Sequence, residues 1–170
     1  MKIGIDFDNT IVNTYETSKK YLDKYKPGNN LKSYHELSDE EEFYFFEKYY
    51  EEITNNLEVF ENVKETFKFL KDNNFKLVLI TARGGNIPEM INVTKRFLEK
   101  KDIVFDEMIF DVFPKGKEAK ENNLDLVIDD TKEVIDDVRK NGVKGLLYGS
   151  DVKNWKEVED YIRKEFLCQE

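Results

Sequence analysis

The feature that most constrains the fold of this chain is a repeated alternation of short apolar runs with longer amphipathic segments. The apolar runs have the length of buried strands and cover residues 2–7, 76–80, 103–110, 125–128 and 144–148. Helical patterns lie between and after them, over residues 63–73, 88–100, 117–122, 131–140 and 152–165. Because strands that alternate with helices form right-handed crossovers, we expect a doubly wound α/β domain on a parallel sheet.

The stretch over residues 13–56 interrupts this alternation. It carries many Tyr and Phe residues among charged ones, with helical patterns over residues 12–25 and 38–54. Ser38 followed by Glu41 is a capping box that predicts the start of the second helix. We therefore expect a small helical cap at residues 13–56, inserted after the first strand of a core made of residues 1–12 and 57–170.

Composition limits the classes of partner. The 170 residues, 39% of them hydrophobic, suffice for one core and a small appendage. A net charge of −9 opposes binding to nucleic acid polymers, which depends on Lys and Arg displacing counterions from many phosphates. A small phosphorylated metabolite remains compatible, since a divalent cation held by carboxylates creates a local positive site.

The cellular context follows from two further features. Cys168 is the single cysteine, so neither an intrachain disulfide nor a cysteine metal cluster can form. The N-terminus does not have the pattern of a signal peptide, and no apolar run approaches the roughly 20 residues that cross a bilayer. We expect a cytoplasmic protein without a membrane partner, and the sequence leaves its oligomeric state open.

Polar residues follow the predicted strands where ligands usually bind in such sheets. Asp6 and Asp8 come at the end of the first strand, Thr81 follows the second, and the pair Asp129 and Asp130 follows the fourth. Two carboxylates as close as Asp6 and Asp8 resist ionising together unless a cation or a shared proton relieves them.

Each of these residues has an ordinary structural interpretation. An Asp-x-Asp pair is often a turn, Thr81 and the Asp pair can cap helices, and Lys115 and Lys117 can be surface charges. All of these interpretations would have to hold together to explain the residues in this order. We therefore favour one site at the carboxyl ends of the strands.

Together the residues resemble the four motifs of the haloacid dehalogenase (HAD) superfamily of phosphohydrolases, over nearly the whole chain. The superfamily's motifs are Asp-x-Asp-x-(Thr/Val), a strand-ending Ser or Thr, a Lys and an acidic pair. They are matched in this order by Asp6, Asp8 and Thr10, then Thr81, then Lys115 or Lys117, then Asp129 and Asp130.

The resemblance implies a Mg²⁺-dependent phosphomonoesterase. Asp6 would attack phosphorus to give an aspartyl-phosphate, while Asp8 would protonate the leaving oxygen and later activate water. Mg²⁺ would be bound by Asp6, the Asp8 carbonyl and one acid of the last motif, with Asp130 as the direct ligand and Asp129 in support. Thr81 and the motif lysine, for which Lys115 has the closer spacing, would stabilise the charge on the phosphoryl group.

The short cap is similar to that of the 5′(3′)-deoxyribonucleotidase group, which implies a deoxynucleotide or another nucleoside monophosphate as substrate. The sequence departs from that group at Asn9 and at Ala82 and Arg83. We expect Thr10, Ala82 and Arg83 to contact the substrate, with the Arg83 guanidinium gripping an anionic group. Cap aromatics either stack on a nucleobase or form the core of the cap.

Four other kinds of protein share parts of this pattern. A receiver domain has the same residue types in another order, with its acidic pair after the first strand, so the order of residues here argues against it. A non-catalytic phosphate-binding or signalling protein on the same fold would more easily have lost Asp8. A phosphotransferase, or a phosphatase for another small ester, stays open.

Overall fold

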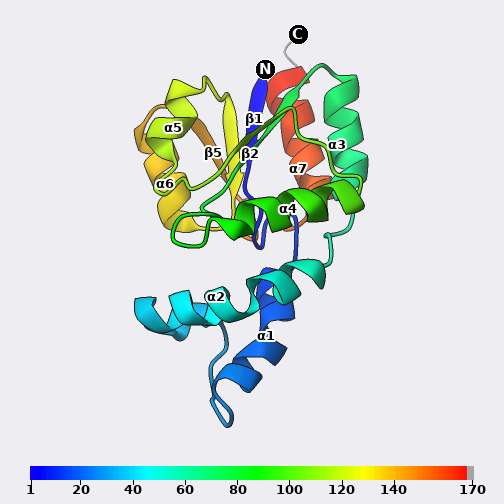
Figure 1. Ribbon diagram of the computed structural model, residues 1–170. Coiled ribbons are helices and arrows are strands. Elements are labelled where there is room, and N and C mark those ends of the chain that lie inside the picture. The colour runs from blue at the N-terminus through cyan, green and yellow to red at the C-terminus, as the bar shows by residue number, and fades with distance from the viewer. Residues whose placement is uncertain (168–170) are drawn as a thin grey trace.

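The computed structural model describes residues 1–167, and Cys168 lies outside them. Its centre is a five-stranded parallel sheet, shown in Figure 1. The strands are β1 (Lys2–Ile5), β2 (Lys76–Ile80), β3 (Glu107–Ile109), β4 (Leu126–Asp129) and β5 (Lys144–Leu147), in the order β3-β2-β1-β4-β5. The predicted doubly wound α/β fold is thereby confirmed.

Helices cover both faces of the sheet (Figure 1). They are α3 (Val63–Asp72), α4 (Glu89–Lys100), α5 (Gly116–Glu121), α6 (Lys132–Lys140) and α7 (Trp155–Ile162), which continues as the π-helical segment η2 (Arg163–Leu167). In Figure 1, α5 and α6 lie on one side of the strands, and α3 and α7 lie on the other. The order of strands reverses at β1, so the ligand site expected of such sheets lies beside that strand.

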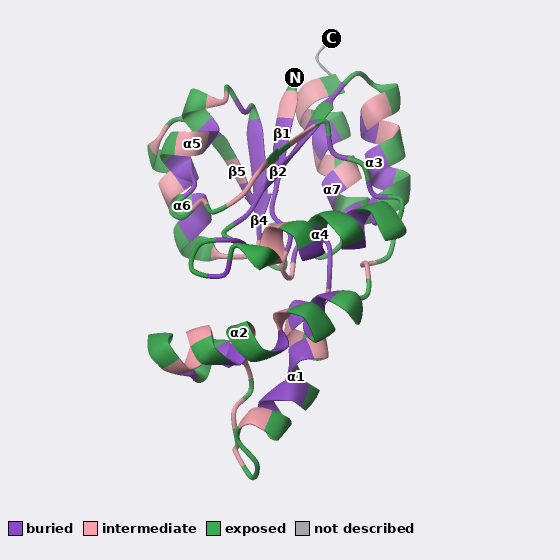
Figure 2. Cartoon of the chain, viewed as in Figure 1, coloured by how far each residue is buried: buried purple, intermediate pink, exposed green. Residues whose placement is uncertain are grey.

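The central strands β1, β2 and β4 are mostly apolar because both faces of the sheet are buried there, whereas the edge strands β3 and β5 are more exposed. Along β2, Leu77 and Leu79 belong to the larger core cluster, whereas Val78 and Ile80 belong to a smaller cluster with residues of α5 and α6. In Figure 2 the strands are accordingly buried along most of their length, while the outer sides of the helices are exposed. This is the arrangement that produces continuous apolar runs in a sequence.

Several elements are one or two residues shorter than the sequence predicts, and two differ by more. The third strand covers Glu107–Ile109 rather than residues 103–110, because β3 is an edge strand that pairs with β2 alone. The last helix begins at Trp155 rather than at residue 152, since the Asn154 side chain accepts a hydrogen bond from the Glu157 N–H at 3.0 Å and so starts the helix there.

The inserted segment contains α1 (Thr14–Tyr25), the short 3-10 helix η1 (Tyr34–Glu36) and α2 (Asp39–Asn55). We call these elements the cap; in Figure 1, α1 and α2 lie beyond one end of the sheet. The predicted capping box is present, with the Ser38 hydroxyl accepting from the Glu41 N–H at 3.3 Å. Aromatic side chains fill the contact between α1 and α2, with Phe45 packed against Tyr25 and Tyr49.

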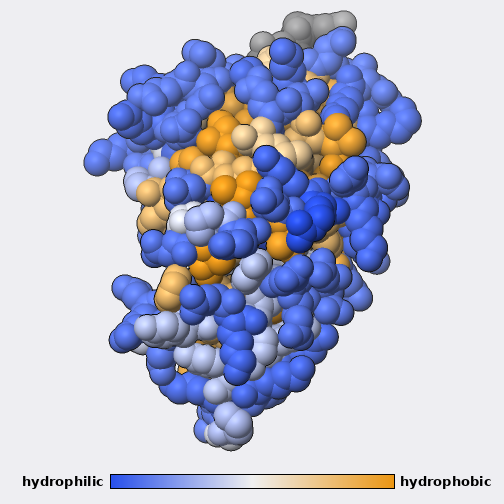
Figure 3. Space-filling model, viewed as in Figure 1, coloured by the Kyte–Doolittle hydropathy of each residue, from blue (hydrophilic) through white to orange (hydrophobic). Residues whose placement is uncertain are grey.

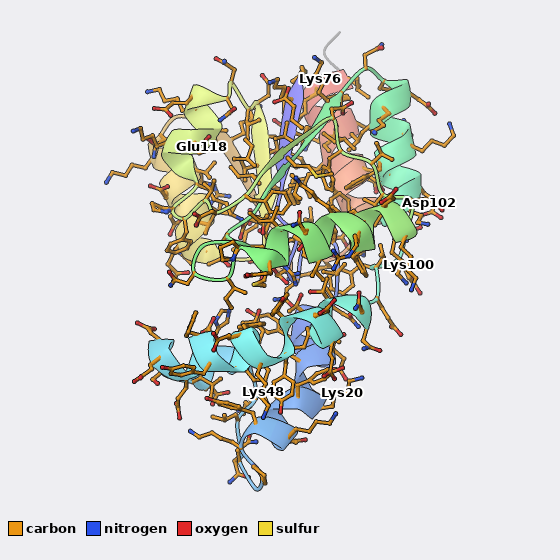
Figure 4. All side chains as sticks on the ribbon, in the orientation of Figure 1. Lys20, Lys48, Lys76, Lys100, Asp102 and Glu118 are labelled. Carbon is orange, nitrogen blue, oxygen red and sulfur yellow. The ribbon has the colours of Figure 1, made fainter. Side chains whose placement is uncertain are left out.

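The cap faces the carboxyl ends of the strands. In Figure 4, Lys76 at the start of β2 lies at the far end of the sheet, while Lys20 and Lys48 lie on the cap. The space-filling view in Figure 3 shows hydrophobic atoms gathered in the α/β part and mostly hydrophilic or intermediate ones over the cap. Among the described helices, none is both long enough and apolar enough to cross a membrane.

Candidate active site

The first site residues come directly after β1. Phe7 is fully buried and packs edge-on against Phe97, with ring centroids 5.7 Å apart. Its neighbours Asp6 and Asp8 both line a cavity of about 620 Å³ between the sheet and the cap. Asn9 follows with a φ of +57°, a left-handed conformation that Asn tolerates better than most residues. The turn thus places two carboxylates at the cavity and sends the chain into the cap.

Lys115 joins Asp6 to Asp129 in a buried cluster. Its Nζ atom lies 2.5 Å from Asp6 Oδ1 and 2.6 Å from Asp129 Oδ2, and its side chain is only 3% exposed. Lys117, the other lysine that matches the motif, is 82% exposed and lies 3.6 Å from Glu121. The geometry therefore brings Lys115 to the acids and leaves Lys117 on the surface.

Charges in this cluster depend on one another. Burial raises the pKa of Asp6 well above its usual value, and the nearby Asp129 and Asp8 carboxylates raise it further against the opposing effect of Lys115. Burial alone would lower the pKa of Lys115, but the Asp6 and Asp129 carboxylates raise it overall. Lys115 is accordingly held charged, and Asp6 gains most from further positive charge nearby.

Asp130 is the least satisfied acid of the cluster. Asp129 accepts from Lys115 and, at 2.8 Å, from the Thr131 N–H, whereas Asp130 accepts a longer bond of 3.4 Å from the Thr131 hydroxyl. Burial, with the charges of Asp129 and Asp8, raises the pKa of Asp130 to about 6. Oxygen atoms of Asp6, Asp129 and Asp130 lie within 4.8 Å of one another, so the set has the chemistry of a divalent cation site.

Arg83, which the sequence predicts to contact substrate, binds protein groups in the structure. Its guanidinium donates from Nε to Asp8 Oδ2 and from Nη2 to Asp8 Oδ1, both at 2.8 Å. Nη1 donates to the hydroxyl of Thr54 at 2.8 Å and to that of Thr94 at 3.0 Å. Arg83 lines the cavity, but its side chain is only 3% exposed and four of its five N–H groups bind protein atoms, so its contact with substrate stays a prediction.

Arg83 also determines the charge of Asp8. Burial would raise the pKa of Asp8, but the charge and hydrogen bonds of Arg83 and the hydroxyl of Thr14 lower it overall. The Thr14 hydroxyl donates to Asp8 Oδ1 at 2.6 Å. The two acids that flank Phe7 therefore differ, with the pKa raised at Asp6 and lowered at Asp8.

The remaining predicted residues divide into two groups. Thr81 and Ala82 line the cavity. Thr10 is fully buried: its hydroxyl donates to Asp6 Oδ2 over 3.4 Å, and its carbonyl accepts from the indole N–H of Trp155 at 2.9 Å. The prediction that Thr10 contacts substrate does not fit this burial, because its side chain supports Asp6 from behind.

The cap supplies the opposite wall of the cavity. Tyr34 is buried, stacks on Tyr15 with a centroid separation of 5.4 Å and meets Phe46 edge-on at 4.9 Å. Its hydroxyl accepts a hydrogen bond from the Asn9 side chain at 3.3 Å. The cap side chains at this wall are Tyr15, Tyr34, His35, Asp39, Glu42, Phe43 and Phe46.

Sequence reasoning missed the residues that hold Arg83 and Asp8. Thr14, Thr54 and Thr94 are buried hydroxyls on three different helices, and each donates to or accepts from this pair. A threonine within a helical pattern carries no signal that separates this role from ordinary packing. Asn9 carried a weak signal, since Asn after a strand favours a turn.

Comparisons with known proteins identify the fold. No protein-family model and no curated protein matches the sequence. The structure resembles a predicted phosphatase from Clostridium acetobutylicum, with a TM-score of 0.70, 17% identity, and coverage of 96% of this chain and 98% of that one. A HAD-superfamily hydrolase of subfamily IA, variant 1, from Geobacter sulfurreducens PCA matches with a TM-score of 0.66, 15% identity and 95% coverage of both chains. The chain has the fold of HAD-superfamily hydrolases.

A HAD phosphatase from Thermococcus onnurineus has the same fold, with a TM-score of 0.60, 17% identity, and coverage of 95% of this chain and 98% of that one. In all three cases the match extends over nearly all of both chains, so it includes the cap as well as the sheet. At these identities the likeness describes the fold alone. The chemistry of this HAD fold has to be argued from its own side chains.

Proposed function

We propose that this protein is a Mg²⁺-dependent phosphomonoesterase that acts through an aspartyl-phosphate on Asp6, with nucleoside monophosphates as its substrates. The observation that carries the proposal is the Lys115 cluster, in which one buried ammonium lies 2.5 Å from Asp6 and 2.6 Å from Asp129 at a cavity of about 620 Å³. A carboxylate nucleophile needs such positive charge because it approaches an anionic phosphate.

The chemistry takes two steps. An Asp6 carboxylate oxygen forms a bond to phosphorus, the ester P–O bond breaks, and a proton brought by the phosphate monoanion passes through the ionised Asp8 carboxylate to the leaving oxygen. Water then attacks the phosphoaspartate, its proton passes to Asp8, and inorganic phosphate leaves as the Asp6 carboxylate is restored. Two N–H groups of Lys115 bind Asp6 and Asp129. Among the described residues the third has no partner, so it is available to a phosphate oxygen.

The donor set fits Mg²⁺. Asp6 and Asp130 have raised pKa values mainly because of burial and neighbouring carboxylates, and a cation would relieve both effects. Asp6, Asp130 and the Asp8 carbonyl would hold the ion, while Asp129 supports it by binding Lys115. When bound, Mg²⁺ supplies positive charge that offsets the repulsion between Asp6 and a phosphate.

The cap wall supports the choice of nucleotides. Phe43, Phe46 and Tyr15 are half-buried at the cavity, so their rings keep apolar surface that a flat base can cover. Tyr34, in contrast, is already enclosed by its neighbours and belongs to the core of the cap. A phosphatase for a different ester is the alternative that the substrate panel below distinguishes.

The test is phosphate release from deoxy- and ribonucleoside monophosphates, sugar phosphates and 4-nitrophenyl phosphate, with Mg²⁺ or EDTA. Wild type should release phosphate with Mg²⁺ and prefer nucleotides, and Asp6→Asn should lower the rate by roughly a thousandfold or more. A preference for another ester would overturn the nucleotide part alone. No release from any ester by folded protein that binds Mg²⁺ would favour a phosphate-binding or signalling role.

A further inference from the structure

Arg83 is a charged residue at the cavity whose role the two chemical steps above leave unassigned. Four of its five N–H groups bind protein atoms, two of them on Asp8. A guanidinium committed in this way cannot also grip a second anionic group of a substrate without losing these bonds. Arg83 is therefore placed to affect the reaction through its hydrogen bonds to Asp8.

We propose that Arg83 is a positioning residue that orients the Asp8 carboxyl group for proton transfer and links this orientation to the cap through Thr54. The inference rests on the proposed function, since it concerns the proton that Asp8 gives to the leaving oxygen.

Arg83 and Thr14 fix the orientation of the Asp8 carboxyl group. Two parallel N–H···O bonds from the planar guanidinium align the carboxyl group with it, and the Phe7 ring lies 4.4 Å from the guanidinium carbon on one side. Oδ1 also accepts from Thr14 at 2.6 Å. Among the described residues, Oδ2 accepts from Arg83 alone. Because the Asp8 side chain is 28% exposed at the cavity, Oδ2 is the oxygen suited to exchange a proton with a bound ester.

Arg83 is itself held from both the cap and the core. Its Nη1 atom bridges two hydroxyls, that of Thr54 near the end of α2 in the cap and that of Thr94 on α4 in the core. Thr54 lies three residues before Leu57, where the cap segment ends and the chain returns to the core. A shift of α2 at this point moves one partner of Nη1 and, through the rigid fork, the plane of the Asp8 carboxyl group. The position of the cap is thereby coupled to the orientation of the Asp8 carboxyl group.

The leaving group provides a readout that separates positioning from simple structural support. An alkoxide leaves poorly unless a proton reaches it as the P–O bond breaks, whereas 4-nitrophenolate leaves without one. A loss of orientation at Asp8 therefore slows an alkyl ester more than an aryl ester. A loss of protein stability, or of substrate contact, acts on both esters alike.

The experiment compares kcat and KM on 4-nitrophenyl phosphate and on the alkyl ester that wild type turns over fastest. For Arg83→Gln we expect kcat/KM, which reports the steps up to formation of the aspartyl-phosphate, to fall by roughly 100-fold on the alkyl ester and by less than roughly tenfold on the aryl ester. Hydrolysis of the aspartyl-phosphate, in which Asp8 also acts, is common to both esters and does not enter kcat/KM. Arg83→Lys should behave similarly because an ammonium cannot make the fork. Arg163→Gln, which changes an exposed arginine paired with Glu159 of α7 and away from the cap, should leave both rates as in wild type.

Thr54→Val and Thr94→Val test the link to the cap without removing a buried charge. Each deletes one hydrogen bond to the same nitrogen, so coupling through the cap predicts a larger change in the aryl-to-alkyl rate ratio for Thr54→Val. Equal changes would overturn the link to the cap. Equal losses of kcat/KM on both esters in Arg83→Gln would overturn the positioning role. If wild type releases no phosphate from either ester, the proposed function fails and this inference fails with it.

Discussion

Two buried basic residues hold the acids of this site, and they differ in how they do so. Lys115 brings one compact charge between two acids, Asp6 and Asp129, and all three belong to the α/β core. The planar guanidinium of Arg83 binds both carboxylate oxygens of Asp8 and also donates a hydrogen bond to Thr54 in the cap. The comparison indicates that Asp6 is held by residues of the α/β core, whereas Asp8 is held jointly by the core and the cap.

Lys115→Met should have the largest effect, because it removes the charge that holds Asp6 and Asp129 together. Removal of one partner from a buried ion pair costs about 3–5 kcal/mol of unfolding free energy, and loss of the cation at the phosphate should lower kcat by roughly 100-fold or more. Urea unfolding and phosphate release measure the two effects. Excess Mg²⁺ should restore part of the stability, because it places positive charge near the same acids. Unchanged activity would show that Lys115 is structural.

Asp130→Asn tests the candidate cation site through the pH dependence of the unfolding free energy. Folding raises the pKa of Asp130 from 3.8 to about 6, so the folded state binds the proton more tightly than the unfolded chain. The stability that this tighter proton binding contributes to the folded state is fully present below about pH 4 and is lost as the pH rises through about 6. In EDTA, the unfolding free energy of wild type should therefore fall relative to Asp130→Asn by about 2 kcal/mol over this range.

The control for that experiment is Asp160→Asn, at an exposed position of α7, which should follow the wild-type curve. Mg²⁺ should oppose the loss in wild type, since it binds the ionised acid. Parallel curves for wild type and Asp130→Asn in EDTA would contradict the raised pKa.

Thr14→Val should lower the stability of the protein by a smaller amount, because it removes one hydrogen bond to Asp8. The Thr14 hydroxyl is buried and donates to Asp8 at 2.6 Å, and a hydrogen bond to a charged group contributes about 1.5 kcal/mol. Thermal unfolding should show the loss, and Thr14→Ser, which keeps the hydroxyl, should show less of it. Equal stability of the two variants would mean that the methyl packing matters and the hydrogen bond does not.

Lys117→Ala should have the smallest effect. This side chain is 82% exposed, and its ion pair with Glu121 is 3.6 Å long, a type of pair that contributes little in water. Phosphate release and thermal midpoint should match wild type. A large loss of activity would reverse the assignment of the motif lysine between Lys115 and Lys117.

Much of the fold could be predicted because burial on both faces makes the central strands β1, β2 and β4 nearly continuous apolar runs. The pattern also indicated that Asp6, Asp8 and Asp129 follow strands and so meet at one edge of the sheet. It could not fix the length of β3, because residues such as Ile103 and Phe105 are buried in a connection rather than in the strand. Apolar character reports burial and not strand pairing.

The site was harder to predict where a role depends on side chains from distant helices. Arg83 suits either a substrate contact or an ion pair, and the choice depends on Thr54 and Thr94, which lie on α2 and α4. Thr10 likewise fits the motif while its side chain is turned to Asp6 and away from solvent. Spacing along the chain identifies which residues gather, but hydrogen-bond partners decide what each one does.

The hydrogen bond from Trp155 to the Thr10 carbonyl joins positions 145 residues apart, so it bears on how the protein is made. A ribosome adds roughly 5–20 residues per second, so the loop that carries Asp6 and Asp8 leaves the exit tunnel roughly 7–30 s before the helix that supports it. During translation that loop and the apolar strand before it stay without their final covering. The segment that carries Asp6 and Asp8 is thus synthesised well before the residue that completes its hydrogen bonding.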